Sequence, residues 1–142
     1  MPVEKSAGAV IFRKNKKIYF LLLHYQGGHW DFPKGIIERG EKPIDTARRE
    51  IEEETGIKDI KFIEGFKKWI KYFFKLKGKT IFKIVTFYLA ETKTKKIKIS
   101  WEHIGYKWLP YEEALEQITF KNSKEVLKKA NEYLSKCLEN KK

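Results

Sequence analysis

Three glutamates on one predicted helix are the residues of this chain best suited to metal chemistry. Glu50, Glu53 and Glu54 fall within about 100° of one another around a helix of about 3.6 residues per turn. Like charges at this spacing repel, so a divalent cation would turn a cost into an attraction. Carboxylate oxygens suit Mg²⁺ or Mn²⁺, and Mg²⁺ commonly bridges a protein to substrate phosphates. A solvated acidic helix face is the alternative interpretation.

The helix that positions these glutamates is predicted over residues 43–55. Proline fits its first position, and Gly56 suits the left-handed residue that often ends a helix. Arg49 directly precedes Glu50, and its guanidinium could hold that carboxylate in one orientation through a bidentate pair. An apolar stripe beside the glutamates would anchor the helix, and it consists of Ile44, Ala47 and Ile51.

The glutamates belong to a longer pattern with fixed spacing. Gly35 is followed after five residues by Glu41, and after seven more by Arg-Glu-Ile-Glu-Glu-Glu-Thr-Gly-Ile at residues 49–57. This pattern resembles the signature of the Nudix hydrolases at every defining position. The resemblance implies an α/β fold, a Nudix-type α/β/α sandwich with a mixed β-sheet between helices. It also implies hydrolysis of a nucleoside diphosphate linked to another group.

The same resemblance implies roles for the residues of the pattern. Glu50 and Glu54 would hold Mg²⁺, or Mn²⁺ in its place, with help from Glu53 and the carbonyl oxygen of Gly35. Arg49 would orient Glu50. Bound cations neutralise phosphate charge and lower the pKa of bound water, and a carboxylate such as Glu54 then accepts the proton.

Segments outside the pattern resemble one Nudix subgroup, the asymmetric diadenosine tetraphosphate hydrolases. These segments are residues 30–35 (Trp-Asp-Phe-Pro-Lys-Gly), residues 87–91, residues 102–109 and Phe120. The resemblance implies that Lys34 contacts phosphate and that Glu102 approaches the cations as a ligand or as the general base. Ile36 departs from the subgroup, whose members often have histidine there.

The subgroup resemblance also implies an adenine stacked between two aromatic rings. Phe87 and Tyr88 point to opposite faces of a predicted strand, so at most one of them serves the site, and Phe87 is the expected one. Phe120 would supply the second ring. His103 and Lys83 are further candidates for phosphate contact. Core packing is the alternative for each ring, and a solvated or half-buried side chain is the alternative for the charged residues.

The length and composition of the chain limit its domain organisation and the cell compartment in which it can be expected. A chain of 142 residues that is 42% hydrophobic predicts a single domain over residues 1–142 with a substantial core. No apolar run approaches the ~20 residues of a membrane span, and the first residues do not resemble a signal peptide. One cysteine excludes an internal disulfide. These features predict a cytoplasmic protein with no membrane partner.

The chain is strongly basic, with 31 Lys and Arg against 19 Asp and Glu and a net charge of +12. Such a charge favours a polyanionic partner. A thermophilic composition rich in lysine, glutamate and isoleucine is a competing explanation. Nucleic acid is possible as a partner but is not favoured, because no arginine-rich or aromatic-interleaved RNA motif stands out.

Hydrophobic periodicity and turn residues predict strands alternating with helices. Strands are predicted over residues 7–12, 18–25, 57–63, 66–76, 80–90 and 97–99, and residues 30–35 are predicted as a loop or a short strand. A hairpin turn is predicted at residues 77–79. Besides residues 43–55, helices are predicted over residues 111–118 and from a cap at Asn122 or Ser123 to about residue 138.

The sequence therefore predicts a metal-dependent pyrophosphohydrolase that cleaves diadenosine tetraphosphate to ATP and AMP by attack of water on phosphorus. Another Nudix substrate is the first alternative: a nucleoside triphosphate, ADP-ribose or a 5′-triphosphate RNA end. A non-catalytic nucleotide- or RNA-binding module is the second. The oligomeric state is left open.

Overall fold

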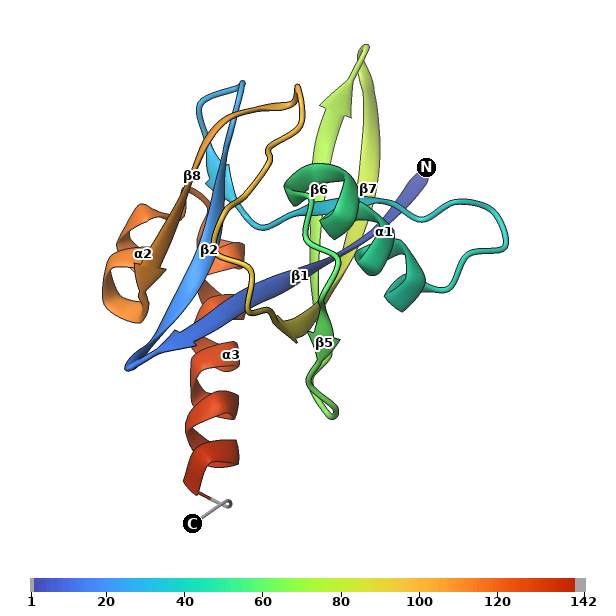
Figure 1. Ribbon diagram of the computed structural model, residues 1–142. Coiled ribbons are helices and arrows are strands. Elements are labelled where there is room, and N and C mark those ends of the chain that lie inside the picture. Colours follow the sequence, from blue (N-terminus) through green and yellow to red (C-terminus); the bar gives the residue numbers. More distant parts are fainter. Residues whose placement is uncertain (1, 140–142) are drawn as a thin grey trace.

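A mixed eight-stranded sheet lies at the centre of the computed structural model, which describes residues 2–139 (Figure 1). The strands are β1 (Val3–Asn15), β2 (Lys17–Tyr25), β3 (Trp30–Asp31), β4 (Lys34–Ile36), β5 (Lys61–Phe62), β6 (Lys68–Leu76), β7 (Lys79–Glu91) and β8 (His103–Pro110). The helices are α1 (Pro43–Thr55), α2 (Tyr111–Gln117) and α3 (Lys121–Glu139).

Strand β1 organises the sheet. It runs parallel to β7 along one edge, from Val3 opposite Phe82 to Phe12 opposite Glu91. Its other edge is divided, because β4 pairs near Ala7 whereas β2 pairs beyond it. β6 extends β7, and β8 extends β2. The division brings β4, and with it the segment leading to α1, onto the middle of the sheet.

Helices cover both faces of this sheet (Figure 1). α1 packs Ala47 and Ile51 onto one face, while α2 and α3 cover the other with residues such as Ala114 and Leu127. Strands between two helical layers are apolar on both sides, which explains the almost continuous hydrophobic run of β2. The α/β/α sandwich predicted from the sequence is confirmed.

The predicted helix over residues 43–55 has the observed bounds of α1. Gly56 ends it in the left-handed conformation, with φ of 77°, and donates its N–H to the Glu52 carbonyl at 2.9 Å. One detail of the predicted anchor is wrong. Ile44 is exposed, and Ala47 and Ile51 alone form the buried stripe.

Two predicted strands are short or missing. Residues 57–63 form a strand only over Lys61–Phe62, and residues 97–99 form none. Ile57, Ile60 and Ile97 are nevertheless buried in the α1-side core, so their apolar character reflects packing of extended loops. The predicted caps of the last helix are also wrong, because α3 begins at Lys121 and places Asn122 and Ser123 within its first turn. No helix in residues 2–139 is long and apolar enough to span a membrane.

Candidate active site

The three glutamates of α1 differ sharply in their exposure. Glu54 is almost fully buried, with 2% of its side chain exposed, Glu50 is 14% exposed, and Glu53 is 58% exposed. A solvated acidic face would leave all three in water. The structure instead removes two adjacent carboxylates from solvent, which is costly for charged groups unless a partner compensates them.

Arg49 holds this part of the helix in place, although its main partner differs from the expected one. Its Nε and Nη2 atoms donate to both carboxylate oxygens of Glu41, at 2.8 and 3.0 Å. Glu50 receives one bond from Nη1, at 2.8 Å. The predicted orientation of Glu50 by Arg49 is therefore present as a single hydrogen bond, while the bidentate pair braces the loop through Glu41. These bonds, together with those from Thr46 and the Glu38 backbone, lower the pKa of Glu41 to about 2.

Glu54 accepts hydrogen bonds from the two strands that face the helix. The backbone N–H of Lys34 donates to it at 3.1 Å, and the hydroxyl of Tyr25 donates at 3.3 Å. The Nε2 atom of His103 lies 3.2 Å from the same carboxylate, and Ser100 Oγ lies 3.0 Å from the other ring nitrogen. Sequence reasoning missed Tyr25. Its position at the end of β2, just before the Gly27-Gly28 turn, was the available signal.

Burial and the charge of neighbouring carboxylates shift Glu50 and Glu54 toward their neutral form. Burial, and then the neighbouring Glu54, raise the pKa of Glu50 to about 7. Burial, and then the charge of Glu102, raise the pKa of Glu54 to about 8 despite its hydrogen bonds. Glu102 is an exposed residue of the loop before β8, and it lies close enough to Glu54 for its charge to raise the pKa of that carboxyl.

The donor set fits a hard divalent cation. Two buried, adjacent carboxylates provide oxygen ligands and a negative charge that a cation would compensate. Within residues 2–139, no three His, Cys, Asp or Glu side chains converge into a finished cation cage. Mg²⁺ does not require one, since it usually binds one or two carboxylates and keeps waters or substrate phosphates as its other ligands.

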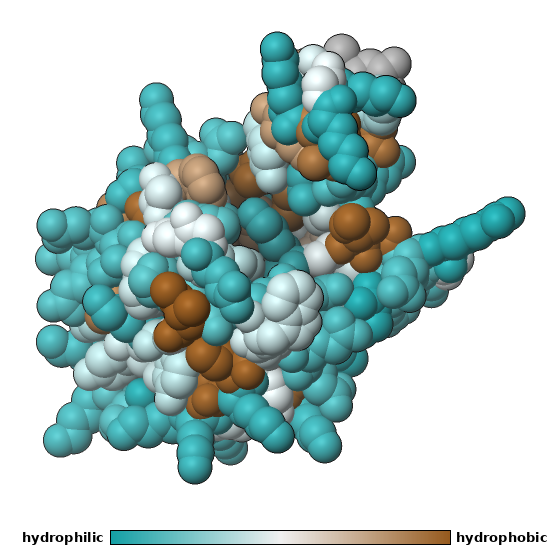
Figure 2. All heavy atoms as spheres, turned by 90° about the horizontal axis from the view of Figure 1, so that it is seen from above, coloured by the Kyte–Doolittle hydropathy of each residue, from teal (hydrophilic) through white to brown (hydrophobic). Residues whose placement is uncertain are grey.

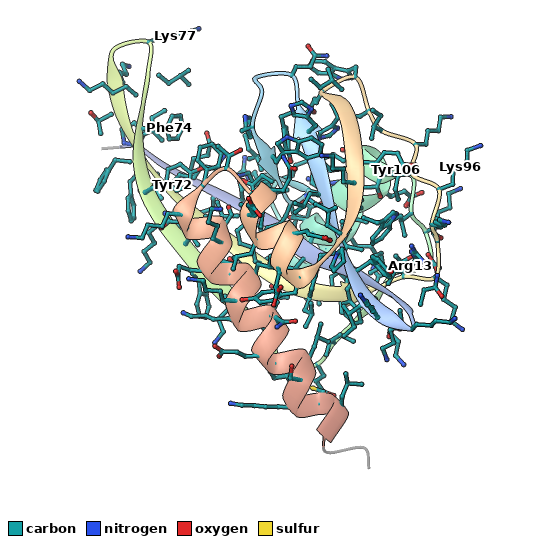
Figure 3. All side chains as sticks on the ribbon, turned by 90° about the vertical axis from the view of Figure 1, so that its left-hand side faces the viewer. Arg13, Tyr72, Phe74, Lys77, Lys96 and Tyr106 are labelled. Carbon is teal, nitrogen blue, oxygen red and sulfur yellow. The ribbon has the colours of Figure 1, made fainter. Side chains whose placement is uncertain are left out.

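A pocket of about 300 Å³ lies beside the carboxylates, and we call it the Tyr72–Phe120 pocket after its two aromatic rings. Lys34 connects it to the acidic site, because its backbone binds Glu54 while its side chain lines the pocket. Lys34 Nζ pairs with the buried Asp31 at 3.0 Å. Burial lowers the pKa of Lys34, but Asp31 outweighs it, so the pKa is raised and the lysine stays charged. Figure 3 shows Tyr72 near the first turn of α3.

The structure does not place three of the predicted substrate contacts at the pocket. Phe87 is fully buried against Phe32, at 5.6 Å between ring centroids, and has no free face for a base. His103 is buried behind Glu54, so it can position that carboxylate but cannot reach a phosphate in solvent. Lys83 Nζ is held 2.7 Å from Glu4 and does not line the pocket. Phe120, by contrast, is half exposed and lines the pocket.

Sequence reasoning also missed Tyr72, the second aromatic residue that lines the pocket with Phe120. The predicted strand over residues 66–76 contained it, and alternation placed it on the same face as Ile70. Both residues line the pocket. The aromatic pair is therefore contributed by β6 and by the connection between α2 and α3.

A mixed sheet between helices, with buried glutamates on the helix that follows β4, defines the Nudix class of proteins. The sequence model of the NUDIX domain matches residues 2–130, and the chain belongs to this family. It is a Nudix hydrolase.

Three named proteins are similar to this chain over all or part of its length. The asymmetrical bis(5′-nucleosyl)-tetraphosphatase of Mus musculus is 38% identical over 143 residues, which cover 92% of this chain and 95% of the mouse protein. A crystal structure of a C. elegans Ap4A hydrolase binary complex superposes with a TM-score of 0.82 at 33% identity, covering 93% of this chain and 98% of the other. An RNA pyrophosphohydrolase of Bartonella clarridgeiae is 37% identical over 82 residues, which cover 52% of this chain and 47% of the other.

Proposed function

We propose that the protein cleaves diadenosine tetraphosphate asymmetrically, to ATP and AMP. The observation that carries this proposal is the junction of the buried Glu50–Glu54 pair with the Tyr72–Phe120 pocket through Lys34. Such a junction binds a nucleoside and its phosphates side by side. The names of the mouse and C. elegans relatives support this choice of substrate.

In this proposal, the residues of the chain have separate roles in binding and in proton transfer. Tyr72 and Phe120 stack the adenine, which is favourable by about 1–3 kcal/mol for each base. Lys34 contacts a phosphate beside the pocket. Glu54 or Glu102 accepts the proton of the attacking water, and a positioned base of this kind contributes about 10²–10⁴-fold to the rate.

We propose Mg²⁺ as the cation, with Mn²⁺ able to replace it. Glu50 and Glu54 would hold it, helped by Glu53, Glu102 and the carbonyl oxygen of Gly35. When bound, the cation neutralises phosphate charge and lowers the pKa of bound water. Arg49 keeps Glu50 aligned for this role through the bond at 2.8 Å.

The direct test is product analysis by chromatography. The protein is incubated with Mg²⁺ and, separately, with diadenosine tetraphosphate, ATP, ADP-ribose and a 5′-triphosphate RNA. We expect the first substrate to react fastest and to give ATP and AMP in equal amounts. Two molecules of ADP would contradict asymmetric cleavage, and faster hydrolysis of another substrate would replace the proposed specificity within the same family.

Replacement of Tyr72 by alanine should weaken substrate binding. We expect Tyr72→Ala to raise KM for diadenosine tetraphosphate about tenfold with a smaller effect on kcat, because the lost stacking is a binding interaction. Steady-state kinetics would measure this. Tyr72→Phe keeps the ring and should restore KM, and Phe73→Ala, on the opposite face of β6, should leave it unchanged. An unchanged KM in Tyr72→Ala would remove this ring from the binding site.

The raised pKa values predict how pH and cation jointly affect stability. The folded metal-free protein keeps protons on Glu50 and Glu54 up to pKa values of about 7 and about 8, whereas carboxyls of the unfolded chain lose them near pH 4.5. The folded state therefore binds more protons over this window, and the free energy of unfolding falls as pH rises through it. A cation that replaces these protons should stabilise the protein more at pH 8 than at pH 5.5.

Thermal unfolding with and without MgCl₂ or MnCl₂ tests this dependence. We expect the cation to raise Tm by several degrees more at pH 8, given about 2–4 °C per kcal/mol for a domain of this size. The double variant Glu50→Gln/Glu54→Gln should lose both the decline with pH and the response to cation. An equal increase at both pH values in the natural protein would contradict the assignment of these two ligands.

We further propose a cytoplasmic location and a small-molecule nucleotide as the main partner. A single cysteine, with no use for an oxidising compartment, supports the location. Fractionation of the source cells with an antibody against the protein would test it.

A further inference from the structure

The β6–β7 hairpin extends beyond the other strands of the sheet. β1 pairs with β7 from Phe82 onward, whereas β6 and β7 stay paired up to Leu76 opposite Lys79. Residues 73–82 therefore form a two-stranded ribbon, which we call the hairpin tip. Figure 1 and Figure 3 both show the tip reaching away from the rest of the chain, with Lys77 at its end. The tip is thus a finger that projects from the body of the molecule.

The hairpin tip exposes large apolar side chains on both of its faces. Phe73 is 62% exposed and Leu76 is 51% exposed. Because side chains alternate along a strand, these two residues point to opposite faces of β6. Exposed apolar groups that gather in one place usually mark a contact with a partner. Neither residue lines the Tyr72–Phe120 pocket, so the proposed function does not explain their exposure.

The charge around the hairpin tip is of one sign. Residues 67–90 contain seven lysines and no acidic residue. Within residues 2–139, Lys83 alone among these lysines forms an ion pair, with Glu4 at 2.7 Å. Three of the others belong to the tip itself, namely Lys75, Lys77 and Lys79.

This combination of lysines and apolar groups needs an explanation beyond the protection of a sheet edge. Lysines on an edge strand deter pairing with another sheet, which would account for the charge but not for the exposed apolar groups beside it. Figure 2 looks down on the end of the molecule that carries the hairpin and shows hydrophobic groups among hydrophilic ones. A partner with negative charge above an apolar layer would match both features.

We propose that the hairpin tip binds the surface of anionic lipid bilayers, with Phe73 and Leu76 at the depth of the headgroups and the tip lysines against the negative charges. Lysines are attracted to an anionic leaflet, and apolar side chains leave water when they enter the interface. The outer edge of β6 pairs with no strand in residues 2–139, so the tip suits the interface, where water can still bond its backbone, rather than the hydrocarbon core.

A bilayer surface fits the hairpin tip better than a protein partner does. A protein surface would cover one face of the ribbon and leave either Phe73 or Leu76 in water, whereas headgroups surround both faces of an inserted finger. A second copy of the chain would bring lysines of like charge together. The sequence predicted no membrane partner because no segment could span a bilayer, but binding at its surface requires no such segment, and this proposal replaces that expectation.

Cosedimentation of the full-length protein with lipid vesicles tests the proposal. Vesicles of phosphatidylcholine with an equal amount of phosphatidylserine supply anionic headgroups, and vesicles of phosphatidylcholine alone are the neutral comparison. We expect binding to the anionic vesicles only, and we expect it to weaken as the NaCl concentration rises. Equal binding to both kinds of vesicle, or binding to neither, would overturn the proposal.

Two double variants separate insertion from charge. Phe73→Ala/Leu76→Ala should lower the partition coefficient onto anionic vesicles about tenfold or more, because two apolar side chains no longer leave water. Lys75→Gln/Lys77→Gln should lower it about 25-fold, at about fivefold for each lysine. Since all four side chains are exposed, we expect both variants to fold.

Matched controls carry the same kinds of change elsewhere. Trp101→Ala/Leu138→Ala removes an 81% exposed tryptophan and an exposed leucine near the end of α3. Lys95→Gln/Lys96→Gln removes two lysines on the far side of the molecule from Lys77 in Figure 3. Both controls should bind anionic vesicles as the natural protein does, and a loss equal to that of the tip variants would overturn the assignment to the tip.

A reporter at the tip distinguishes a bilayer from other polyanions. The emission of Leu76→Trp, taken as the difference from the natural protein, should shift to the blue with anionic vesicles and stay unchanged with poly-glutamate. Natural vesicle binding in Phe73→Ala/Leu76→Ala, together with no blue shift, would mean adsorption by charge alone and would overturn the proposal.

The proposal does not rest on the proposed function, and activity measurements keep the two apart. Phe73→Ala/Leu76→Ala should keep the natural kcat/KM for diadenosine tetraphosphate while it loses vesicle binding, since neither residue lines the Tyr72–Phe120 pocket. If the protein does not cleave that substrate but binds vesicles with the expected losses, the proposed substrate fails and the membrane contact stands.

Discussion

Replacement of Glu54 by glutamine should lower kcat for diadenosine tetraphosphate by at least about 100-fold and leave the protein folded. The substitution preserves the shape of a side chain that is 2% exposed, but it removes the oxygen charge that a cation or a proton requires. The Lys34 N–H at 3.1 Å and the Tyr25 hydroxyl at 3.3 Å donate to different oxygens of Glu54, so the single amide oxygen of glutamine can keep one of these two bonds. Removing a buried carboxylate should leave Tm unchanged or higher.

Steady-state kinetics and thermal unfolding of the same preparation measure the two effects. Glu52→Gln is the matched control, because Glu52 is an exposed glutamate of the same helix and should keep natural activity. A loss smaller than tenfold in Glu54→Gln would remove this residue from the chemistry and leave Glu102 as the better candidate for the base.

The part of the site on α1 could be predicted because its order is local. Helical periodicity alone places Glu50 and Glu54 on one face, and Gly56 ends the helix where a left-handed residue is needed. The spacing from Gly35 through Glu41 to Arg49 adds the bracing loop, and the observed bonds of Arg49 fall within that segment. No contact between distant strands is required to infer any of these features.

The residues around the Tyr72–Phe120 pocket are placed by contacts between distant segments, and hydrophobic periodicity does not reveal such contacts. Alternation correctly separates Phe87 from Tyr88, but helices cover both faces of β7, so both residues become core. Tyr72 lies on an edge strand with alternating half-buried and exposed residues, and only its packing beside α3 identifies the functional face. Lys83 meets Glu4 because β1 and β7 pair in parallel, which the sequence around Lys83 does not reveal.

The orientation of two neighbouring side chains, Glu102 and His103, explains the remaining difference between the predicted site and the observed one. Adjacent residues of the loop and strand before Pro110 take opposite roles, because Glu102 faces solvent while His103 turns inward against Glu54. The adjacency of His103 to Glu102 suggested that His103 would reach a phosphate beside the cation site. The inward turn instead makes His103 a positioning residue and leaves only Glu102 free to approach the site from the loop.

Replacement of Gly35 by alanine should abolish most activity for a purely steric reason. A β-carbon at residue 35 would lie 2.0 Å from Cδ of Glu50 and 2.1 Å from its Oε1, where no real contact is possible. Either β4 or Glu50 must move, and both movements disturb the ligand set on α1. We expect kcat to fall about 100-fold, as a small misplacement of catalytic groups can cause, and Tm to fall by several degrees from overpacking.

A double variant distinguishes this clash from a general loss of structure. Gly35→Ala/Glu50→Ala removes the side chain that the new methyl group meets, so Tm should recover toward that of Glu50→Ala while activity stays low. Gly105→Ala is the control, because its β-carbon would meet nothing closer than His24 Cβ at 3.9 Å. Natural activity in Gly35→Ala would mean that Glu50 can leave its observed position without cost, and Glu50 would then have no fixed role in holding the cation.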